Sequence, residues 1–174
     1  MQRRKLGADG PDVSAIGVGA MSFADFYGPT DEAASHAILD AAREAGVSHV
    51  DTANVYGMGK SENAIGDYLR ADPGARDDFV IATKAAIARD ADGQRRFDNS
   101  AAHLEAELDR SLGRMGIDCV DLFYVHRRDP EVPIEEVAGT LRRLVEKGKT
   151  RAIGFSENAP SSLRRAVAVH PKDA

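Results

Sequence analysis

The chain has 174 residues, a formal net charge of −5 and an isoelectric point near 5.5. This length suffices for one domain with a sizeable core, and an acidic chain without a block of basic residues is not expected to bind nucleic acid. No apolar stretch approaches the roughly 20 residues of a membrane-spanning helix, and the first residues lack the apolar run of a signal peptide. The single cysteine, Cys119, is expected to be a buried, reduced strand residue. We therefore expect a soluble, cytoplasmic protein.

The chain is expected to form one domain over residues 1–174, beginning with a small hairpin over residues 1–14. The hairpin has its turn at Ala8–Pro11 and is expected to lie over the bottom of the fold. Repeated strand–helix units follow over residues 15–171. The strands are predicted from five short apolar runs, at Ala15–Gly19, Ser48–Asp51, Phe79–Lys84, Val120–His126 and Arg151–Ser156.

A segment with helical spacing follows each run. Capping residues are expected at the helix starts, and Gly or Pro is expected beyond the helix ends. Thr30 or Asp31 is predicted to cap the first helix, and Ser61 the second. The predicted helices are Asp31–Ala45, Ser61–Arg70, Asn99–Met115, Ile134–Lys147 and Ser161–Val169.

Five repeated strand–helix units leave two main architectures, an open doubly wound sheet or a (β/α)8 barrel. The first strand-to-helix turn reads GVGAMSFADFYGPTDE and lacks the third glycine of a dinucleotide-binding fingerprint. This disfavours the doubly wound sheet. We predict an α/β fold of the (β/α)8 barrel type, cut short at about five units.

Chemically active residues gather where the predicted strands end. Asp51, Lys84 and His126 close the second, third and fourth runs, and Tyr56 lies in the loop after Asp51. In a parallel array the carboxyl ends of the strands share one face, where barrel enzymes keep their active sites. Any one of these residues alone is most simply a surface charge, a turn residue or a structural histidine. Their occurrence together predicts a site.

The four side chains make chemical sense as a set. An ammonium near a phenol favours the phenolate and lowers a tyrosine's pKa, an aspartate holds that ammonium in place, and a neutral imidazole orients a carbonyl oxygen. Such a site protonates an oxygen that becomes negative when hydride reaches its carbon. The spacing of His103, His126 and His170 predicts no metal site, and no G-x-S-x-G elbow of a hydrolase is present.

The sequence resembles the aldo-keto reductase superfamily. The matching segments are GVGAMSF, HVDTANVYGMGKSENAIGDYL, FVIATK and DLFYVHRRDPEVPIEEVAGTLRRLVEKGKTRAIGFSE, so the resemblance runs from about Arg4 to Pro171. It implies a (β/α)8 barrel that reduces aldehydes or ketones to alcohols with NADPH. The segments YGMGKSE and HRRDPEVPIEEV are most similar to the branch that also resembles potassium-channel β-subunits.

The resemblance also implies a role for each matching residue. Tyr56 would be the general acid, Lys84 would lower its pKa, Asp51 would support Lys84, and His126 would orient the carbonyl. Further positions would hold the cofactor: Gly19, Met21 and Asp51 at the nicotinamide ribose, and Ser156, with Asn158 as a weaker candidate, at the carboxamide.

One departure from the family pattern is large, because TIM-type barrels take about 250 residues and this sequence ends after five units. The first and fifth strands are then expected to be open edges. We expect the chain to be marginally stable, to self-associate through these edges, or to be a piece of a longer gene product. Two alternatives to a reductase stay open: a non-catalytic binding or regulatory module, and a metabolite-binding half-barrel that pairs with itself.

Overall fold

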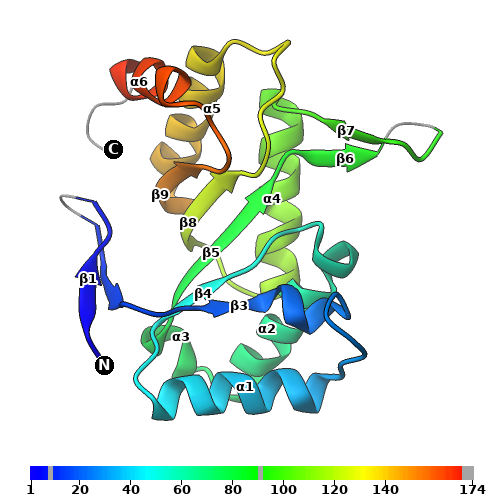
Figure 1. The fold of residues 1–174 in the computed structure, drawn as a ribbon, viewed down its shortest axis with the longest axis vertical. Coiled ribbons are helices and arrows are strands. Elements are labelled where there is room, and N and C mark those ends of the chain that lie inside the picture. Colours follow the sequence, from blue (N-terminus) through cyan, green and yellow to red (C-terminus); the bar gives the residue numbers. More distant parts are fainter. Residues whose placement is uncertain (8–9, 90–91, 170–174) are drawn as a thin grey trace.

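The fold is built on a parallel sheet of five strands (Figure 1). The computed structural model describes residues 1–7, 10–89 and 92–169. The strand order is β3-β4-β5-β8-β9, and every pair of neighbours is parallel. All five expected strands are confirmed, with β3 shorter than its apolar run. Their bounds are β3 Val18–Gly19, β4 His49–Asp51, β5 Val80–Ala85, β8 Val120–Val125 and β9 Thr150–Phe155.

The five expected helices are confirmed to within two residues at each end, and a short sixth, α3, joins them. Asp31 caps α1, because its carboxylate accepts the Ala34 N–H at 2.8 Å, and Ser100 caps α4 by accepting the His103 N–H at 3.3 Å. The helices are α1 Glu32–Glu44, α2 Lys60–Ala71, α3 Ala75–Asp78, α4 Ala101–Met115, α5 Ile134–Glu146 and α6 Pro160–Val169.

The predicted cap of α2 by Ser61 is wrong. The helix begins at Lys60 after Gly59 and has no side-chain cap. Ser61 is fully buried, so its hydroxyl is used in tertiary contacts: it bonds the Thr52 hydroxyl at 2.7 Å and donates to the Ala20 carbonyl at 2.7 Å. These bonds tie the start of α2 to the segments that follow β3 and β4.

The N-terminal hairpin pairs β1 (Arg3–Lys5) with β2 (Asp12–Ser14) in antiparallel register. Ser14 and Ser48 exchange two bonds, in which each backbone N–H donates to the other hydroxyl, at 3.0 and 2.8 Å. Ser48 directly precedes β4, so the hairpin lies at the amino ends of the strands, as expected for the bottom of a barrel. Residues 8 and 9 of its expected turn, and residues 170 and 171 of the last expected unit, lie outside the described residues.

Several short elements were not expected from the sequence. Two of them are 3-10 turns, η1 (Ala20–Ala24) after β3 and η2 (Tyr56–Gly59) after β4. A second hairpin, β6 (Ile87–Arg89) with β7 (Arg95–Phe97), follows β5 and extends away from the sheet (Figure 1). Both strands of this hairpin are three residues long, too short for a periodic apolar pattern to reveal them.

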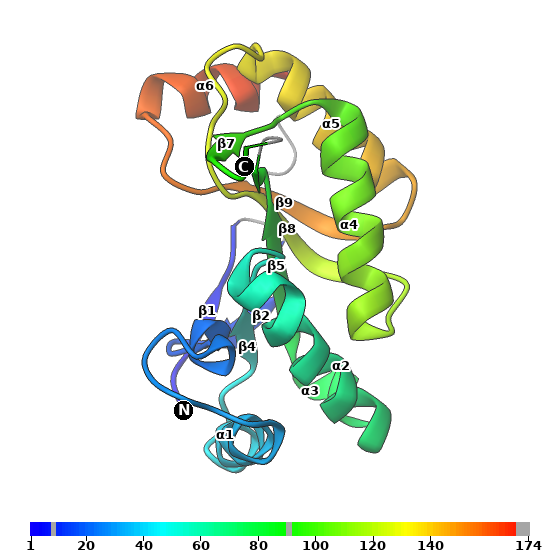
Figure 2. The same cartoon turned by 90° about the vertical axis from the view of Figure 1, so that its right-hand side faces the viewer.

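Helices α2, α3 and α4 run along one side of the sheet (Figure 2), and α4 contacts both β5 and β8. The core between these layers contains Phe123 of β8 with Leu104 and Leu108 of α4, all fully buried. This packing anchors the strands whose carboxyl ends carry the predicted site. The architecture is that of a partial barrel.

Cys119 differs from its expected position. It is half-buried and lies directly before β8 rather than in it, with its thiol donating to the Val120 carbonyl at 3.3 Å. Within the described residues, no helix is both long enough and apolar enough to span a membrane.

Candidate active site

Parallel strands bring three of the predicted catalytic residues to one edge of the sheet. Asp51 is the last residue of β4, Lys84 is the penultimate residue of β5, and His126 directly follows β8. The His126 backbone N–H donates to the Ala85 carbonyl at 2.7 Å, which continues the pairing of β5 and β8 beyond the strand end. Tyr56 begins η2, five residues after Asp51.

Lys84 is the buried centre of this group, with 7% of its surface exposed. Its ammonium donates to the carboxylate of Asp51 and, at 2.8 Å, to the Thr52 carbonyl. The same nitrogen lies 5.2 Å from the centroid of the Tyr56 ring. A buried ammonium needs such partners because an unpaired charge is costly away from water. The positive charge is therefore fixed next to the phenol.

Tyr56 and His126 form an edge-to-face pair, with ring centroids 5.8 Å apart and an interplanar angle of 83°. The Tyr56 hydroxyl makes no hydrogen bond to any residue that the structure describes. It is thus available to a bound molecule.

His126 is buried, and burial is the main cause that lowers its pKa, to about 4. The positive charges of Lys84, Arg127 and Arg95 lower it further. Its Nδ1 is buried without a hydrogen-bond partner among the described side chains and backbone groups. At neutral pH the imidazole is uncharged and carries one N–H that can donate.

Four of the candidate cofactor residues lie on or shortly after the two outer strands of the sheet, and the fifth, Asp51, belongs to the catalytic group. Gly19 ends β3, and a Cβ added there would meet nothing within 4 Å, so the backbone is open to a ligand. Ser156 follows β9 and accepts from Arg127 at 3.3 Å. Asn158 donates to the Ser156 carbonyl at 3.0 Å, while its Oδ1 is buried without a partner among the described residues.

A cleft of about 950 Å³ opens beside Tyr56 and His126. Met21 lines it too, whereas Gly19, Asp51, Ser156 and Asn158 do not. The cleft therefore borders the catalytic pair on one side, and most of the candidate cofactor residues lie elsewhere.

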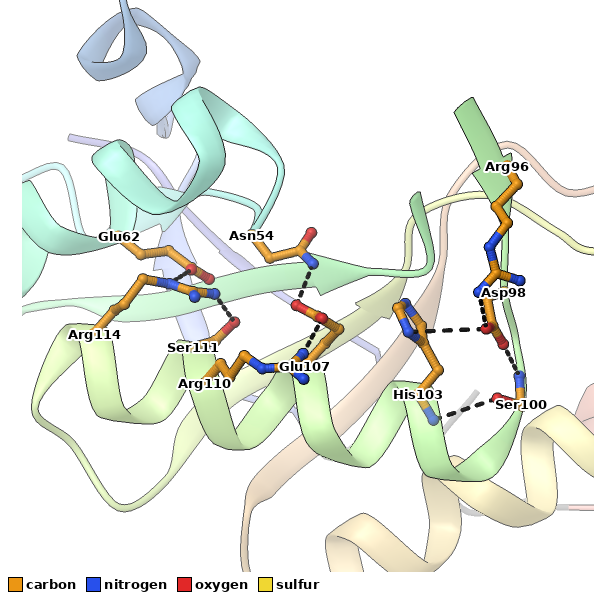
Figure 3. A network of polar contacts seen from close by, with 10 residues as sticks. All are labelled: Asn54, Glu62, Arg96, Asp98, Ser100, His103, Glu107, Arg110, Ser111 and Arg114. Carbon is orange, nitrogen blue, oxygen red and sulfur yellow. Dashed lines mark hydrogen bonds and ion pairs between the residues drawn. The ribbon is translucent and has the colours of Figure 1, made fainter. Parts of the chain in front are cut away.

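Residues of α4 and of the β6–β7 hairpin line this cleft and form its polar wall. Figure 3 shows the polar contacts around α4. Asn54 donates to Glu107 at 2.9 Å, Glu107 also pairs with Arg110, and His103 Nδ1 lies 3.9 Å from Asp98. Close by, the fully buried Glu62 pairs with Arg114 at 2.6 Å. Ion pairs and hydrogen bonds thus hold the polar wall in place.

Sequence reasoning missed most of the residues of this wall. Arg95 and Arg96 are exposed residues of β7 that line the cleft. Arg127 is half-buried and also lines it. A usable signal was the segment ARDADGQRRF, which places three arginines in the loop after Lys84, where barrel sites are built. The described residues include no group of three His, Cys, Asp or Glu side chains placed to hold a metal.

Comparison with known proteins relates this geometry to a family. A model described as "Aldo/keto reductase family" matches residues 15–173. The chain is similar to "Aldo-keto reductase yakc [NADP(+)]" of Schizosaccharomyces pombe, with 41% identity over 98% of this chain and 50% of the relative. It is also similar to "Probable aldo-keto reductase 1" of Glycine max, with 37% identity over 98% of this chain and 49% of that protein. The chain spans about half the length of these curated relatives.

Among solved structures, the aldo-keto reductase AKR11C1 from Bacillus halodurans in its holo form superposes with a TM-score of 0.83 at 30% identity. The match covers 97% of this chain and 54% of that one. The glycerol dehydrogenase AKR11B4 from Gluconobacter oxydans gives 0.84 at 28% identity, over 98% and 53% of the two chains. Strand order, the residues at the strand ends and the family match agree: the chain belongs to the aldo/keto reductase family.

Proposed function

We propose that this chain carries the catalytic half of an oxidoreductase that reduces aldehydes or ketones to alcohols with NADPH. The observation that supports this most is the convergence of Asp51, Tyr56, Lys84 and His126 at the carboxyl ends of β4, β5 and β8. Family membership supports the same reaction class, and the name of the fission yeast relative includes NADP(+).

The residues present fit a nicotinamide cofactor. The buried Oδ1 of Asn158 is an acceptor suited to a carboxamide N–H, and Ser156 lies two residues before it in sequence. The open backbone at Gly19 leaves room for a ribose, beside Met21 and Asp51. When bound, the cofactor supplies the hydride that is added to the carbonyl carbon.

Cys119 forms no internal disulfide, so a reducing compartment, the cytoplasm, is the location we propose.

The protein neutralises and stabilises the negative charge that develops on the carbonyl oxygen. The Tyr56 hydroxyl gives its proton to this oxygen as hydride arrives at the carbon. The resulting tyrosinate is stabilised by the ammonium of Lys84, which Asp51 keeps in place. The neutral imidazole of His126 donates its N–H to the same oxygen and thereby orients the carbonyl.

This proposal is tested by exchanging the phenol. We expect Tyr56→Phe to lower kcat/KM for 4-nitrobenzaldehyde by roughly 100-fold or more, because the general acid is lost. The Kd of NADPH, measured by fluorescence titration, should stay the same. Tyr27→Phe is the matched control, since Tyr27 is 73% exposed and should leave the rate unchanged. Equal rates in wild type and Tyr56→Phe would refute the assignment of the acid.

A second candidate is a non-catalytic binding module. It is favoured by one observation, that the candidate cofactor residues Gly19, Ser156 and Asn158 do not line the cleft beside Tyr56. A folded chain that binds no NADPH and turns over no aldehyde would support this alternative. Saturable binding of NADPH with turnover that depends on Tyr56 would support the reductase.

A further inference from the structure

The cleft beside Tyr56 is rich in positive charge although the chain is acidic. Over the whole sequence 28 acidic residues outnumber 23 basic ones. Among the described residues that line the cleft the balance is reversed, with Glu107 as the one carboxylate. The basic residues are Arg89, Arg95, Arg96, Arg110, Arg114 and Arg127. A concave surface of one sign raises the local concentration of ligands of the opposite sign.

Four of the six arginines are paired with carboxylates of the chain. The pairs are Arg96 with Asp98 at 3.0 Å, Arg110 with Glu107, Arg114 with Glu62 at 2.6 Å, and Arg127 with Glu157 at 2.7 Å. The contacts of the other two are of a different kind. Arg89 donates to the Gly93 carbonyl at 2.8 Å, and the Arg95 guanidinium lies 5.2 Å from the centre of the Phe97 ring. Neither of these two contacts, both with residues that the structure describes, neutralises the guanidinium.

Arg89 and Arg95 also face each other. They are direct partners in the antiparallel register of β6 and β7, so their side chains leave the hairpin on the same face. Like charges in directly opposed positions destabilise a hairpin. Asp92 lies in the turn between the strands and is not among the residues that line the cleft. An anion bound between the two guanidinium groups would relieve this repulsion.

Arg89 and Arg95 line the same cleft as the predicted reaction centre. Tyr56 and His126 line the same cleft, and the charge of Arg95 is one of those that act on His126. The cleft also has large apolar lining residues, Met21, Phe26 and Met58. A molecule that fills the cleft would thus have its carbonyl at Tyr56, an apolar body against the methionines and phenylalanine, and a charged end at the hairpin.

We propose that the cleft selects carbonyl compounds with an apolar body and an anionic group, a carboxylate or a phosphate, and that Arg89 and Arg95 bind this anionic group. Guanidinium groups present a planar fork of N–H donors that matches the oxygens of both anions. The inference rests on the proposed function, because it identifies the cleft as the substrate side of the reductase. It assigns Arg89 and Arg95 to specificity and leaves the chemical step to the residues at the strand ends.

The test compares 4-formylbenzoate with its methyl ester, which has no charge and one more methyl group. With NADPH and the wild-type chain we expect kcat/KM to favour the acid by about tenfold or more, as hydrogen bonds to charged groups predict. In the double variant Arg89→Gln with Arg95→Gln the preference should disappear, because kcat/KM falls more for the acid than for the ester. Arg164→Gln is the control, because this exposed arginine of α6 does not line the cleft. An unchanged preference in the double variant would overturn the proposal.

A binding measurement keeps the inference testable if the chain turns over neither aldehyde. Calorimetric titration with the alcohol product, 4-(hydroxymethyl)benzoate, should give a Kd about tenfold higher for the double variant than for wild type and for Arg164→Gln. This result without turnover would sustain the inference and count against the proposed function. Equal Kd values, or no binding to the wild type, would overturn the inference.

The cofactor's own phosphates are the competing anions. If Arg89 and Arg95 serve them, the double variant will bind NADPH more weakly and still prefer the acid to the ester, which contradicts the proposal. Thermal unfolding checks that the double variant is folded. Because the substitutions remove a repulsive pair, the Tm of the double variant should equal or exceed that of wild type.

Discussion

His126 shows at the residue scale how burial determines chemical role. An exposed histidine has a pKa near 6.5 and is partly charged at physiological pH. Here burial and three nearby cations lower the pKa to about 4. The side chain is therefore a neutral hydrogen-bond donor, which suits the orientation of a carbonyl oxygen better than a proton shuttle at neutral pH would.

The lowered pKa of His126 predicts how stability changes with pH. Between pH 6.5 and 4 the unfolded chain binds a proton at this residue that the folded chain does not, so the free energy of unfolding decreases as the pH falls through this range. Above pH 6.5 the free energy of unfolding does not change with pH because of this residue. By pH 4 the residue has lowered the free energy of unfolding by about 3 kcal/mol. Urea unfolding from pH 7 to pH 4.5 should show a shallower decrease for His126→Gln than for wild type. Parallel curves for the two proteins would contradict the assignment.

At the scale of elements, the contact between α2 and α4 depends on one glycine. A Cβ added to Gly66 of α2 would lie 2.3 Å from the Arg114 carbonyl oxygen and 2.9 Å from the Met115 Cα. Both are backbone atoms of α4, so they cannot move aside as a flexible side chain would. The close approach also lets Glu62 of α2 reach Arg114 of α4.

We therefore expect Gly66→Ala to lower the free energy of unfolding by about 1–3 kcal/mol, as overpacking does. Gly113→Ala is the matched control within α4, since a Cβ there meets nothing within 4 Å. It should raise stability by up to about 1 kcal/mol, because alanine favours the helix over glycine. Urea unfolding measures both. A neutral Gly66→Ala would show that the two helices can separate at no cost.

At the scale of the whole molecule, the sheet has two outer strands, β3 and β9. Within the described residues β9 pairs with β8 alone, and it is six residues long. The Ser156 N–H donates to Val125 of β8, so by the alternation of a parallel strand the N–H groups of Ile153 and Phe155 point to the open side. An edge of this kind is a template for pairing with another chain.

We predict that the chain self-associates through β9 as its concentration rises. Light scattering after size-exclusion chromatography should show a mass above that of the monomer. Hydrogen exchange at the Ile153 and Phe155 amides should then slow as concentration increases. The Ala152 and Gly154 amides, which point to β8, provide the internal control and should be protected at every concentration. A monomer whose edge amides exchange fast throughout would refute self-association.

Much of the fold was predictable because it depends on local patterns. The apolar runs predicted strands within three residues of their observed starts, and Asp31 caps the first helix as expected. Ser61 was mistaken for a cap because a buried serine and a capping serine look alike in sequence. The hairpin β6–β7 escaped notice because its pairing of Arg89 with Arg95 has no apolar signal.

The sequence by itself determined the order of the strand–helix units and the convergence of Asp51, Lys84 and His126. Periodicity sets which segments are strands, and parallel strands necessarily bring their carboxyl ends to one edge. Only the tertiary structure decided which side chains surround that edge. The neutral state of His126 and the arginine wall of the cleft arise from burial and contacts between segments far apart in the chain, and these depend on packing in three dimensions.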